Sequence, residues 1–262
     1  EQAISLKPDV VILNQDAYKG AQDSGLIDQL AQAGIPTVII DFREKPLENT
    51  VPSTLLMGKL MGKEGRAQKF VDFYLQQLNE VYSRVDKIIK PKPTVFIDRA
   101  SGYTDCCGTF GRANLGLLIE RAGGHNIGSD LVPGWSGNVN PEEIVSADPD
   151  VIIATGANWS ATLPDGYIEL GYKTALETAQ ADLQQLVENR NWGMLQSVQN
   201  KRLHGIWHQF YNSPYHFVAL QQFAKWLYPE EFQDIDPAAN FAAFHKEFLP
   251  IEYSGTFWAD LN

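Results

Sequence analysis

The feature that most constrains the fold is an internal repeat. Residues 4–13 contain a Pro-Asp pair followed by a run of apolar residues, and residues 144–153 repeat the pattern. Each copy predicts a helix end, a turn and a strand with two apolar faces. Such strands pair in parallel and are covered by helices on both faces. We therefore predict an α/β chain of two Rossmann-like lobes with parallel-rich sheets.

The segment between the two repeats predicts one long helix. Apolar residues of 64–89 recur on one helical stripe, and at about 1.5 Å per residue the segment extends roughly 39 Å. Pro91 and Pro93 then precede a strand at 94–98. We expect an N-terminal lobe over 1–63, a linking helix over 64–90 and a C-terminal lobe over 91–262. By the internal symmetry, the N-terminal lobe lacks its first strand and helix.

Charge and apolar runs exclude several classes of protein. The chain has 21 basic and 32 acidic residues and a net charge of -11, so no positive field attracts phosphate backbones and we expect no nucleic-acid partner. The longest apolar runs fall far short of the roughly 20 residues that cross a bilayer. Only two cysteines occur, Cys106 and Cys107, and the sequence leaves open whether they form a disulfide.

Aromatic and basic residues gather near the predicted carboxyl ends of strands and in the loops beside them, where open α/β sheets bind ligands. Rings provide contact area and guanidinium groups provide forked donors to oxyanions, which suits a bulky, planar or aromatic ligand with negative charge. The competing interpretation is that the rings pack in the core and the arginines are surface charges. The predicted ligand-binding residues are Tyr18, Arg43, Arg99, Tyr103, Arg112, Trp135, Trp159, His208 and Tyr211.

Two of these residues are also candidate metal ligands. His208 and Tyr211 stand three positions apart, and imidazole and phenolate both coordinate ferric iron, so the pair is suited to completing the coordination of a chelated iron. The alternative, which we favour, is hydrogen bonding to an organic ligand or to the helix that begins near Ser213 and Pro214, because two ligands do not make a cage. We expect no resident cofactor.

Sequence motifs give little support to an enzyme. The phosphate-binding loop, the His-Glu-x-x-His motif and the Gly-x-Ser-x-Gly motif are all absent. We therefore expect binding without catalysis. The alternative is a chelatase-like or metal-dependent hydrolytic enzyme in which His208 acts with Asp98 or Asp105 in acid–base chemistry.

Several segments, in their order and spacing, resemble a known family. They are Lys7-Pro8-Asp9-Val10-Val11-Ile12, Arg121-Ala122-Gly123-Gly124-His125-Asn126-Ile127, Asn140-Pro141-Glu142-Glu143-Ile144, Asp148-Pro149-Asp150-Val151-Ile152-Ile153 and Tyr253-Ser254-Gly255-Thr256-Phe257-Trp258. The chain resembles the helical-backbone (class III) periplasmic substrate-binding proteins of ABC importers, which serve ferric siderophores, haem and vitamin B12.

The resemblance implies two α/β lobes, a rigid linking helix and a shallow cleft that binds the ligand. We expect capture of a ferric siderophore or a similar iron chelate, with haem, cobalamin and a molybdate-type oxyanion as alternatives. The implied partner is an ABC permease in the membrane, with Glu44 or Glu48 and Glu142 or Glu143 as candidate docking residues. We expect a monomer that is periplasmic, or exported and lipid-anchored.

Overall fold

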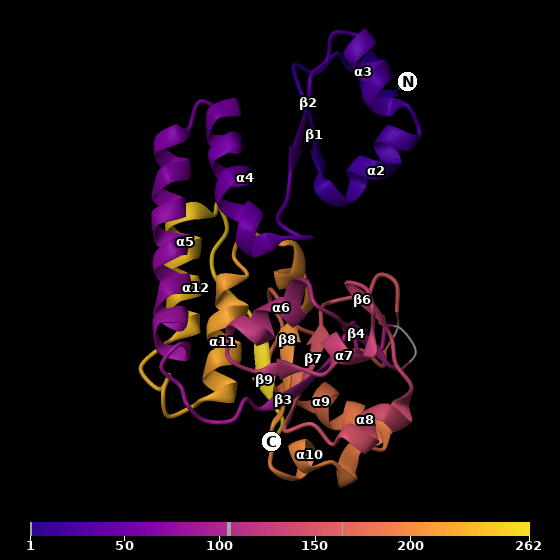
Figure 1. The fold of residues 1–262 in the computed structure, drawn as a ribbon, viewed down its shortest axis with the longest axis vertical. Helices are drawn as coiled ribbons and strands as arrows, with labels where there is room; N and C mark the ends of the chain where they lie inside the picture. Colours follow the sequence, from indigo (N-terminus) through magenta and orange to yellow (C-terminus); the bar gives the residue numbers. More distant parts are fainter. Residues whose placement is uncertain (1, 104–105, 164) are drawn as a thin grey trace. The chain divides into compact units, whose positions relative to one another are not determined.

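The computed structural model describes residues 2–103, 106–163 and 165–262, and it is a mixed α/β structure with a parallel-rich sheet (Figure 1). This confirms the predicted fold class. The chain divides into two compact units, unit 1 with Glu1–Phe73 and Asn212–Pro214, and unit 2 with Tyr74–Tyr211 and Tyr215–Asn262. The division falls inside one helix, between Phe73 and Tyr74.

Unit 1 is built around two parallel strands that pair from Val11 with Thr37 to Asn14 with Ile40. Two helices lie along one side of this pair (Figure 1). The elements are α1 (Gln2–Ser5), β1 (Val11–Asn14), α2 (Gln15–Asp23), α3 (Leu26–Gln32), β2 (Thr37–Ile40), α4 (Pro46–Leu60) and the first part of α5 (Glu64–Val85).

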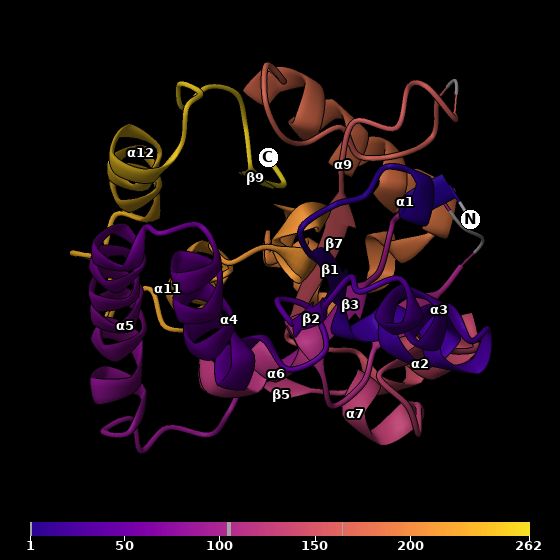
Figure 2. The ribbon, with the colours of Figure 1, turned by 90° about the horizontal axis from the view of Figure 1, so that it is seen from above.

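The helix α4 was not predicted from the sequence. It begins with Pro46 in its first turn and contains Pro52 within it, and it lies beside the first part of α5 (Figure 2). A Cβ atom at Gly58 would lie 2.5 Å from the Cβ of Ala67, so glycine allows this close approach. A helix is observed in the expected segment 64–90 as α5, but it ends at Val85, because tight turn bonds such as Ile88 N–H to Val85 O replace the helical pattern. Its role as a link between two lobes stays a prediction.

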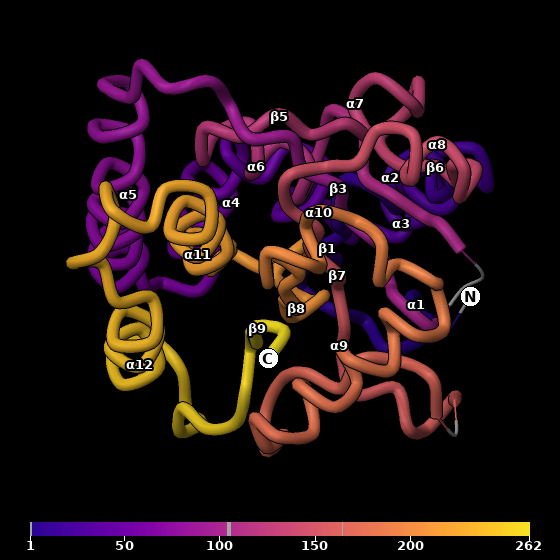
Figure 3. The backbone as a smooth tube through the Cα atoms, turned by 90° about the horizontal axis from the view of Figure 1, so that it is seen from below, coloured from indigo at the N-terminus to yellow at the C-terminus, as the bar shows by residue number. Residues whose placement is uncertain are grey.

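Unit 2 is built around a five-stranded sheet in the order β5-β3-β7-β8-β9, in which only β9 is antiparallel to its neighbour. The helices α9 and α11 lie on opposite sides of the sheet (Figure 3). Because both faces are covered, every residue of β7 and β8 is buried, as the apolar runs predicted. The strands are β3 (Thr94–Asp98), β4 (Gly108–Phe110), β5 (His125–Asn126), β6 (Ser136–Asn138), β7 (Val151–Gly156), β8 (Leu203–Trp207) and β9 (Trp258–Asp260).

The helices of unit 2 lie between its strands in the chain. The helix α9 ends at Arg190 because Asn191 adopts a left-handed conformation, and two short helices follow. The helices are α6 (Asn114–Arg121), α7 (Gly128–Leu131), α8 (Pro141–Ala147), α9 (Leu176–Arg190), η1 (Trp192–Met194), α10 (Gln196–Gln199), η2 (His208–Asn212), α11 (Phe217–Leu227) and α12 (Pro237–Phe248).

Within the described residues, no helix combines the length and the apolar character that crossing a bilayer requires.

Candidate ligand-binding site

Four of the predicted ligand-binding residues form a chain of ring contacts in unit 2. The ring centroids of Tyr103 and Trp159 are 5.0 Å apart, those of Trp159 and His208 are 5.6 Å apart, and those of His208 and Tyr211 are 4.7 Å apart. Such spacings are typical of edge-to-face and tilted aromatic contacts. The structure therefore brings these four side chains together at one place.

A fifth predicted residue, Trp135, joins the group through Phe110. The ring centroid of Phe110 lies 6.3 Å from that of Trp135, 6.4 Å from that of His208 and 6.5 Å from that of Tyr211. Tyr167 also contacts Trp159, at 5.9 Å. We call the seven residues Tyr103, Phe110, Trp135, Trp159, Tyr167, His208 and Tyr211 the aromatic cluster.

The register of the parallel strands shows why three members of the aromatic cluster come from one edge of the sheet. Asp98 pairs with Ala154 and Gly156 pairs with Trp207, so the strands β3, β7 and β8 end at one edge of the sheet. Tyr103, Trp159 and His208 each come from a segment that follows one of these strands. The rule that ligands bind beyond the carboxyl ends of parallel strands was therefore sufficient to find them.

Phe110 and Trp135 reach the cluster through a pair of short strands that are separated in the chain by α6, β5 and α7 and that the sequence did not reveal. The strands β4 and β6 are antiparallel, and Gly111 N–H donates to Trp135 O at 2.9 Å just beyond them. A side chain at Gly111 would collide with Gly134 O, so the two chain segments need glycine at this crossing. The only sequence signal for Phe110 was its place inside the glycine-bearing loop 108–111.

The aromatic cluster is partly accessible to solvent. Tyr103 is 45% exposed and Trp135 is 50% exposed, whereas Phe110 is only 1% exposed. Trp159, His208 and Tyr211 are half-buried. The buried Phe110 ring thus supports rings that are themselves partly exposed.

His208 is held by a hydroxyl group from the neighbouring strand. Thr155 Oγ1 lies 2.8 Å from His208 Nδ1, and the same oxygen accepts a hydrogen bond from Ala100 N–H at 2.7 Å. Thr155 is fully buried near the end of β7. It therefore connects the imidazole to the segment that follows β3 and carries Arg99 and Tyr103.

Two of the three predicted arginines, Arg99 and Arg112, belong to unit 2 and lie in different surroundings. Arg99 follows β3 directly, and its Nε is buried without a hydrogen-bond partner among the described residues. A Cβ at Gly108 would lie 3.3 Å from Arg99 Nη2, so this side chain lies across the glycine that begins β4. Arg112 is exposed and donates from Nε to Ser129 O at 3.2 Å.

The other two predicted residues, Tyr18 and Arg43, belong to unit 1, and a ligand-binding role stays a prediction for all nine residues. Tyr18 is on α2, and Arg43 forms an ion pair with Asp16. Arg43 N–H also donates to Asp41 Oδ1 at 2.8 Å, so a buried carboxylate fixes its backbone.

Asp98, the last residue of β3, has a buried carboxyl group. Asp98 is 1% exposed, and burial raises the pKa of its carboxyl to about 6, although the positive charge of Arg190, 3.7 Å away, opposes the rise. Neither carboxyl oxygen has a hydrogen-bond partner among the described residues. Asp105, the other carboxylate considered for acid–base chemistry, lies outside the described residues.

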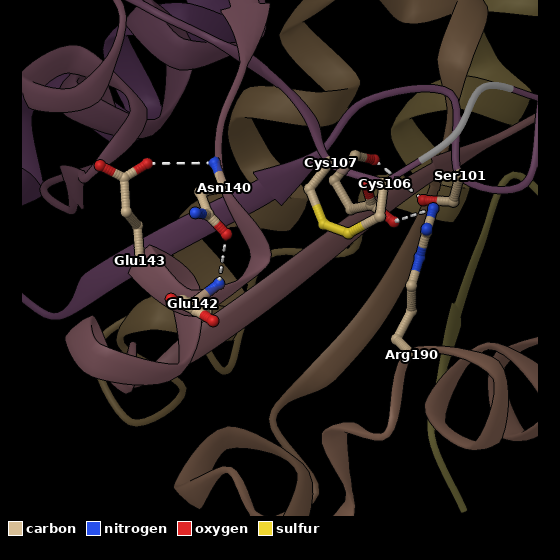
Figure 4. Close-up of a disulfide and its surroundings, with 8 residues drawn as sticks. Ser101, Cys106, Cys107, Asn140, Glu142, Glu143 and Arg190 are labelled. Atoms are coloured by element: carbon tan, nitrogen blue, oxygen red, sulfur yellow. Dashed lines mark hydrogen bonds and ion pairs between the residues drawn. A yellow bond between two sulfur atoms is a disulfide. The ribbon is translucent and has the colours of Figure 1, made fainter.

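The two cysteines are joined to each other. Figure 4 shows the Cys106–Cys107 disulfide beside Ser101, with the Arg190 side chain extending toward them. Ser101 Oγ donates to Asp98 O at 3.0 Å. In the sequence, the disulfide stands between two members of the aromatic cluster, Tyr103 and Phe110.

Within residues 2–103, 106–163 and 165–262, no group of three or more His, Cys, Asp or Glu side chains is placed to hold a metal ion. The role of His208 and Tyr211 as ligands that complete a chelated iron stays a prediction.

Comparison with known proteins defines the class. The model of the periplasmic binding protein family matches residues 1–207, and this chain belongs to that family. Family members are substrate-binding proteins, as the resemblance implied.

Three similar proteins place the chain within the family. The TroA-like periplasmic binding protein FepB from Veillonella parvula is 32% identical with a TM-score of 0.91, over 100% of this chain and 74% of that one. The molybdate periplasmic binding protein MolA from Haemophilus influenzae, whose structure contains molybdate, shares the fold at 18% identity and a TM-score of 0.71, over 97% of this chain and 76% of that one. A cobalamin-binding protein from Halobacterium salinarum is 28% identical over 58% of this chain, and the match spans only 39% of that relative.

Proposed function

We propose that this chain is the substrate-binding component of an ABC importer and that it captures a ferric siderophore or a similar iron chelate. The observation that carries the proposal is the aromatic cluster, in which rings from segments that follow β3, β7 and β8 contact one another, while Arg99 directly follows β3. Ferric chelates are bulky, often contain aromatic or amide planes, and frequently carry negative charge. Rings and a nearby guanidinium group suit that chemistry.

The family supports the remaining parts of the proposal. The partner is an ABC permease, and Glu142 and Glu143 are candidates for docking to it, because both are exposed in the first turn of α8. Glu143 accepts a hydrogen bond from Asn140 N–H at 3.1 Å, which completes the capping box of this helix (Figure 4). We also propose an exported monomer, periplasmic or lipid-anchored, that binds without catalysis and has no resident cofactor.

A second candidate ligand is a tetrapyrrole-type macrocycle, either cobalamin or haem. The specific support is the 28% identical relative described as a cobalamin-binding protein, together with the half-exposed rings of Tyr103 and Trp135. Molybdate comes after these, because a small oxyanion needs mainly arginine and backbone donors and gains little from aromatic surface.

A fluorescence titration tests the proposal. All six tryptophans belong to unit 2, and Trp135 and Trp159 are the two in the aromatic cluster. Ferric and metal-free hydroxamate and catecholate chelates, hemin, cyanocobalamin and molybdate are each added to the protein. We expect saturable quenching by a ferric chelate. Flat signals with every ferric chelate would overturn the proposal, and a Soret shift with hemin would favour haem.

Matched variants show whether the signal comes from the aromatic cluster. W159F removes an indole that contacts Tyr103, Tyr167 and His208, whereas W258F removes a half-buried indole on β9. We expect W159F to lose most of the quenching and W258F to keep it. W159A should weaken binding about tenfold, equal to about 1.4 kcal/mol. Equal quenching in both Phe variants would place the ligand elsewhere.

A further inference from the structure

We propose that the Cys106–Cys107 disulfide is a redox modification site, and that a dithiol which opens it lowers the affinity of the aromatic cluster for its ligand. The effect on the ligand rests on the proposed function, whereas the opening of the disulfide is a property of the protein alone. The disulfide stands at one end of a hydrogen-bonded pair of chain segments that has Phe110 and Trp135 at its other end.

The disulfide directly precedes β4, the strand that ends with Phe110. Val139 N–H donates to Cys107 O at 2.9 Å, and the antiparallel pairing of β4 with β6 continues from this bond. The pairing ends at the bond from Gly111 N–H to Trp135 O, which is also 2.9 Å long. The two strands therefore connect the disulfide, by backbone pairing alone, to the two residues that supply rings to the aromatic cluster.

The same end of β4 also holds a basic residue from the segment that follows β3. Arg99 N–H donates to Gly108 O at 2.8 Å, and Gly108 directly follows Cys107 in the chain. A Cβ at Gly108 would lie 3.3 Å from Arg99 Nη2, so the guanidinium group lies against the strand at this residue. A change at the disulfide therefore acts on the contact between β4 and Arg99, one of the predicted ligand-binding residues.

The two cysteines of the disulfide differ in exposure (Figure 4). Cys107 is fully buried, whereas Cys106 is partly exposed. Thiol–disulfide exchange requires a thiolate to reach one of the two sulfur atoms, so we expect the attack at Cys106. The first thiolate of the dithiol forms a bond to Cys106 Sγ, and the bond between the cysteine sulfurs breaks. Its electron pair leaves with Cys107 Sγ, which takes up a proton.

The second thiolate of the same dithiol completes the exchange. It attacks the reductant's own sulfur in the mixed disulfide, so that Cys106 leaves as a thiolate and takes up a proton. The products are the thiols of Cys106 and Cys107 and the disulfide of the reductant. Two electrons and two protons therefore pass from the dithiol to the protein. In an oxidising compartment the closed form persists until such a dithiol opens it.

Opening the disulfide should change local order more than global stability. A disulfide between neighbouring residues closes a minimal loop, so the entropic stabilisation that grows with loop length is small. It does join the side chains of both cysteines at the start of β4, and both gain conformational freedom when it opens. A ligand that contacts the rings of Phe110 and Trp135 must then order this segment again, which lowers the affinity.

The modification is tested first on protein without ligand, purified from an oxidising compartment without added reductant. Acid quenching, alkylation in urea and mass spectrometry count the thiols. We expect no alkylated cysteine before treatment and both cysteines alkylated after treatment of the folded protein with dithiothreitol. Free thiols in the purified protein, or a disulfide that dithiothreitol opens only in urea, would overturn the proposal. A reduced protein that unfolds would also overturn it.

Proton–nitrogen NMR of the indole groups then shows whether the change reaches the aromatic cluster. Trp135 lies at the far end of the pairing that begins at the disulfide, whereas Trp192 is buried against Phe96 and serves as the control. The variants W135F and W192F assign the two signals. We expect dithiothreitol to shift or broaden the Trp135 signal and to leave the Trp192 signal unchanged. An unchanged Trp135 signal in fully reduced protein would refute the link to the cluster.

Ligand affinity is measured with a ferric hydroxamate under argon, after desalting has removed the dithiothreitol so that it does not react with the iron. We expect the reduced wild type to bind about tenfold more weakly than the oxidised wild type, and reoxidation with diamide to restore the affinity. The variant C106S keeps the buried thiol of Cys107 and cannot form the disulfide. It should bind as weakly as the reduced wild type, with or without dithiothreitol treatment.

Equal affinity of the oxidised and reduced wild type would overturn the proposal, and this comparison stays decisive if C106S does not fold. Failure of every chelate to bind would overturn the proposed function instead. The thiol count and the Trp135 signal are read without ligand, so they still test the redox site in that case. The two failures are therefore distinguishable.

Discussion

The buried carboxyl of Asp98 makes a quantitative prediction about stability. Burial raises the pKa of Asp98 from its ordinary value of 3.8 to about 6, with the positive charge of Arg190 opposing the rise. Its side chain is only 1% exposed, so solvent screening does not reduce the effect. The substitution D98N keeps the shape of the side chain and removes the titration.

The direction in which the free energy of unfolding changes with pH follows from the number of protons that each state binds. The folded protein holds the Asp98 proton up to a pH of about 6, whereas the unfolded chain releases it near 3.8, so the folded state binds more protons between these values. The free energy of unfolding therefore falls as the pH rises through this window. A difference of about two pH units, at about 1.36 kcal/mol each, corresponds to a loss of about 3 kcal/mol above pH 6.

We expect D98N to be about 3 kcal/mol more stable than the wild type near pH 7 and equally stable near pH 4. Urea unfolding followed by tryptophan fluorescence measures this, because all six tryptophans belong to unit 2, as Asp98 does. The control is D86N, which changes an exposed aspartate at the end of α5 in the same unit. A D98N variant less stable than the wild type near pH 7 would refute the reasoning.

Three further variants test packing and hydrogen bonds. G116A places a Cβ against Gly111 O and 2.5 Å from Asn126 Nδ2, so we expect a loss of about 2 kcal/mol in urea unfolding, while G193A, in open space, should change stability by less than about 0.5 kcal/mol. D260A removes the oxygen that accepts from His204 Nδ1 at 2.6 Å and from Trp226 Nε1 at 2.8 Å, so we expect the free energy of unfolding to fall by about 2 kcal/mol. An unchanged free energy of unfolding would mean that these two hydrogen bonds do not hold β9 in place. Y172F leaves the buried Nε2 of His245 without a donor and should lower the thermal midpoint by a few degrees, about 1 kcal/mol.

Much of the architecture could be predicted because it depends on local pattern. The strands β3 and β8 are apolar runs with turn residues or a proline before them, and β7 is the second copy of the internal repeat. Tyr103, Trp159 and His208 could be predicted as neighbours because the rule for parallel sheets requires only the strand ends.

The rest depends on contacts that a single sequence does not contain. The strands β4 and β6 have three residues each, too few to show alternation, so Phe110 was missed as the ring that joins Trp135 to the cluster. The bond between Thr155 and His208 depends on the register of β7 against β8. The helix α4 was missed because Pro52 inside it normally argues against a helix.

The central claim is that the aromatic cluster is the surface that binds the ligand. Proton–nitrogen NMR of the indole groups tests it directly, since Trp135 and Trp159 belong to the cluster while Trp192 is buried against Phe96 and Trp226 is stacked on His204. On addition of a ferric chelate, we expect shifted or broadened signals for Trp135 and Trp159 and unchanged signals for Trp192 and Trp226. Saturable binding that leaves Trp135 and Trp159 unchanged would contradict it.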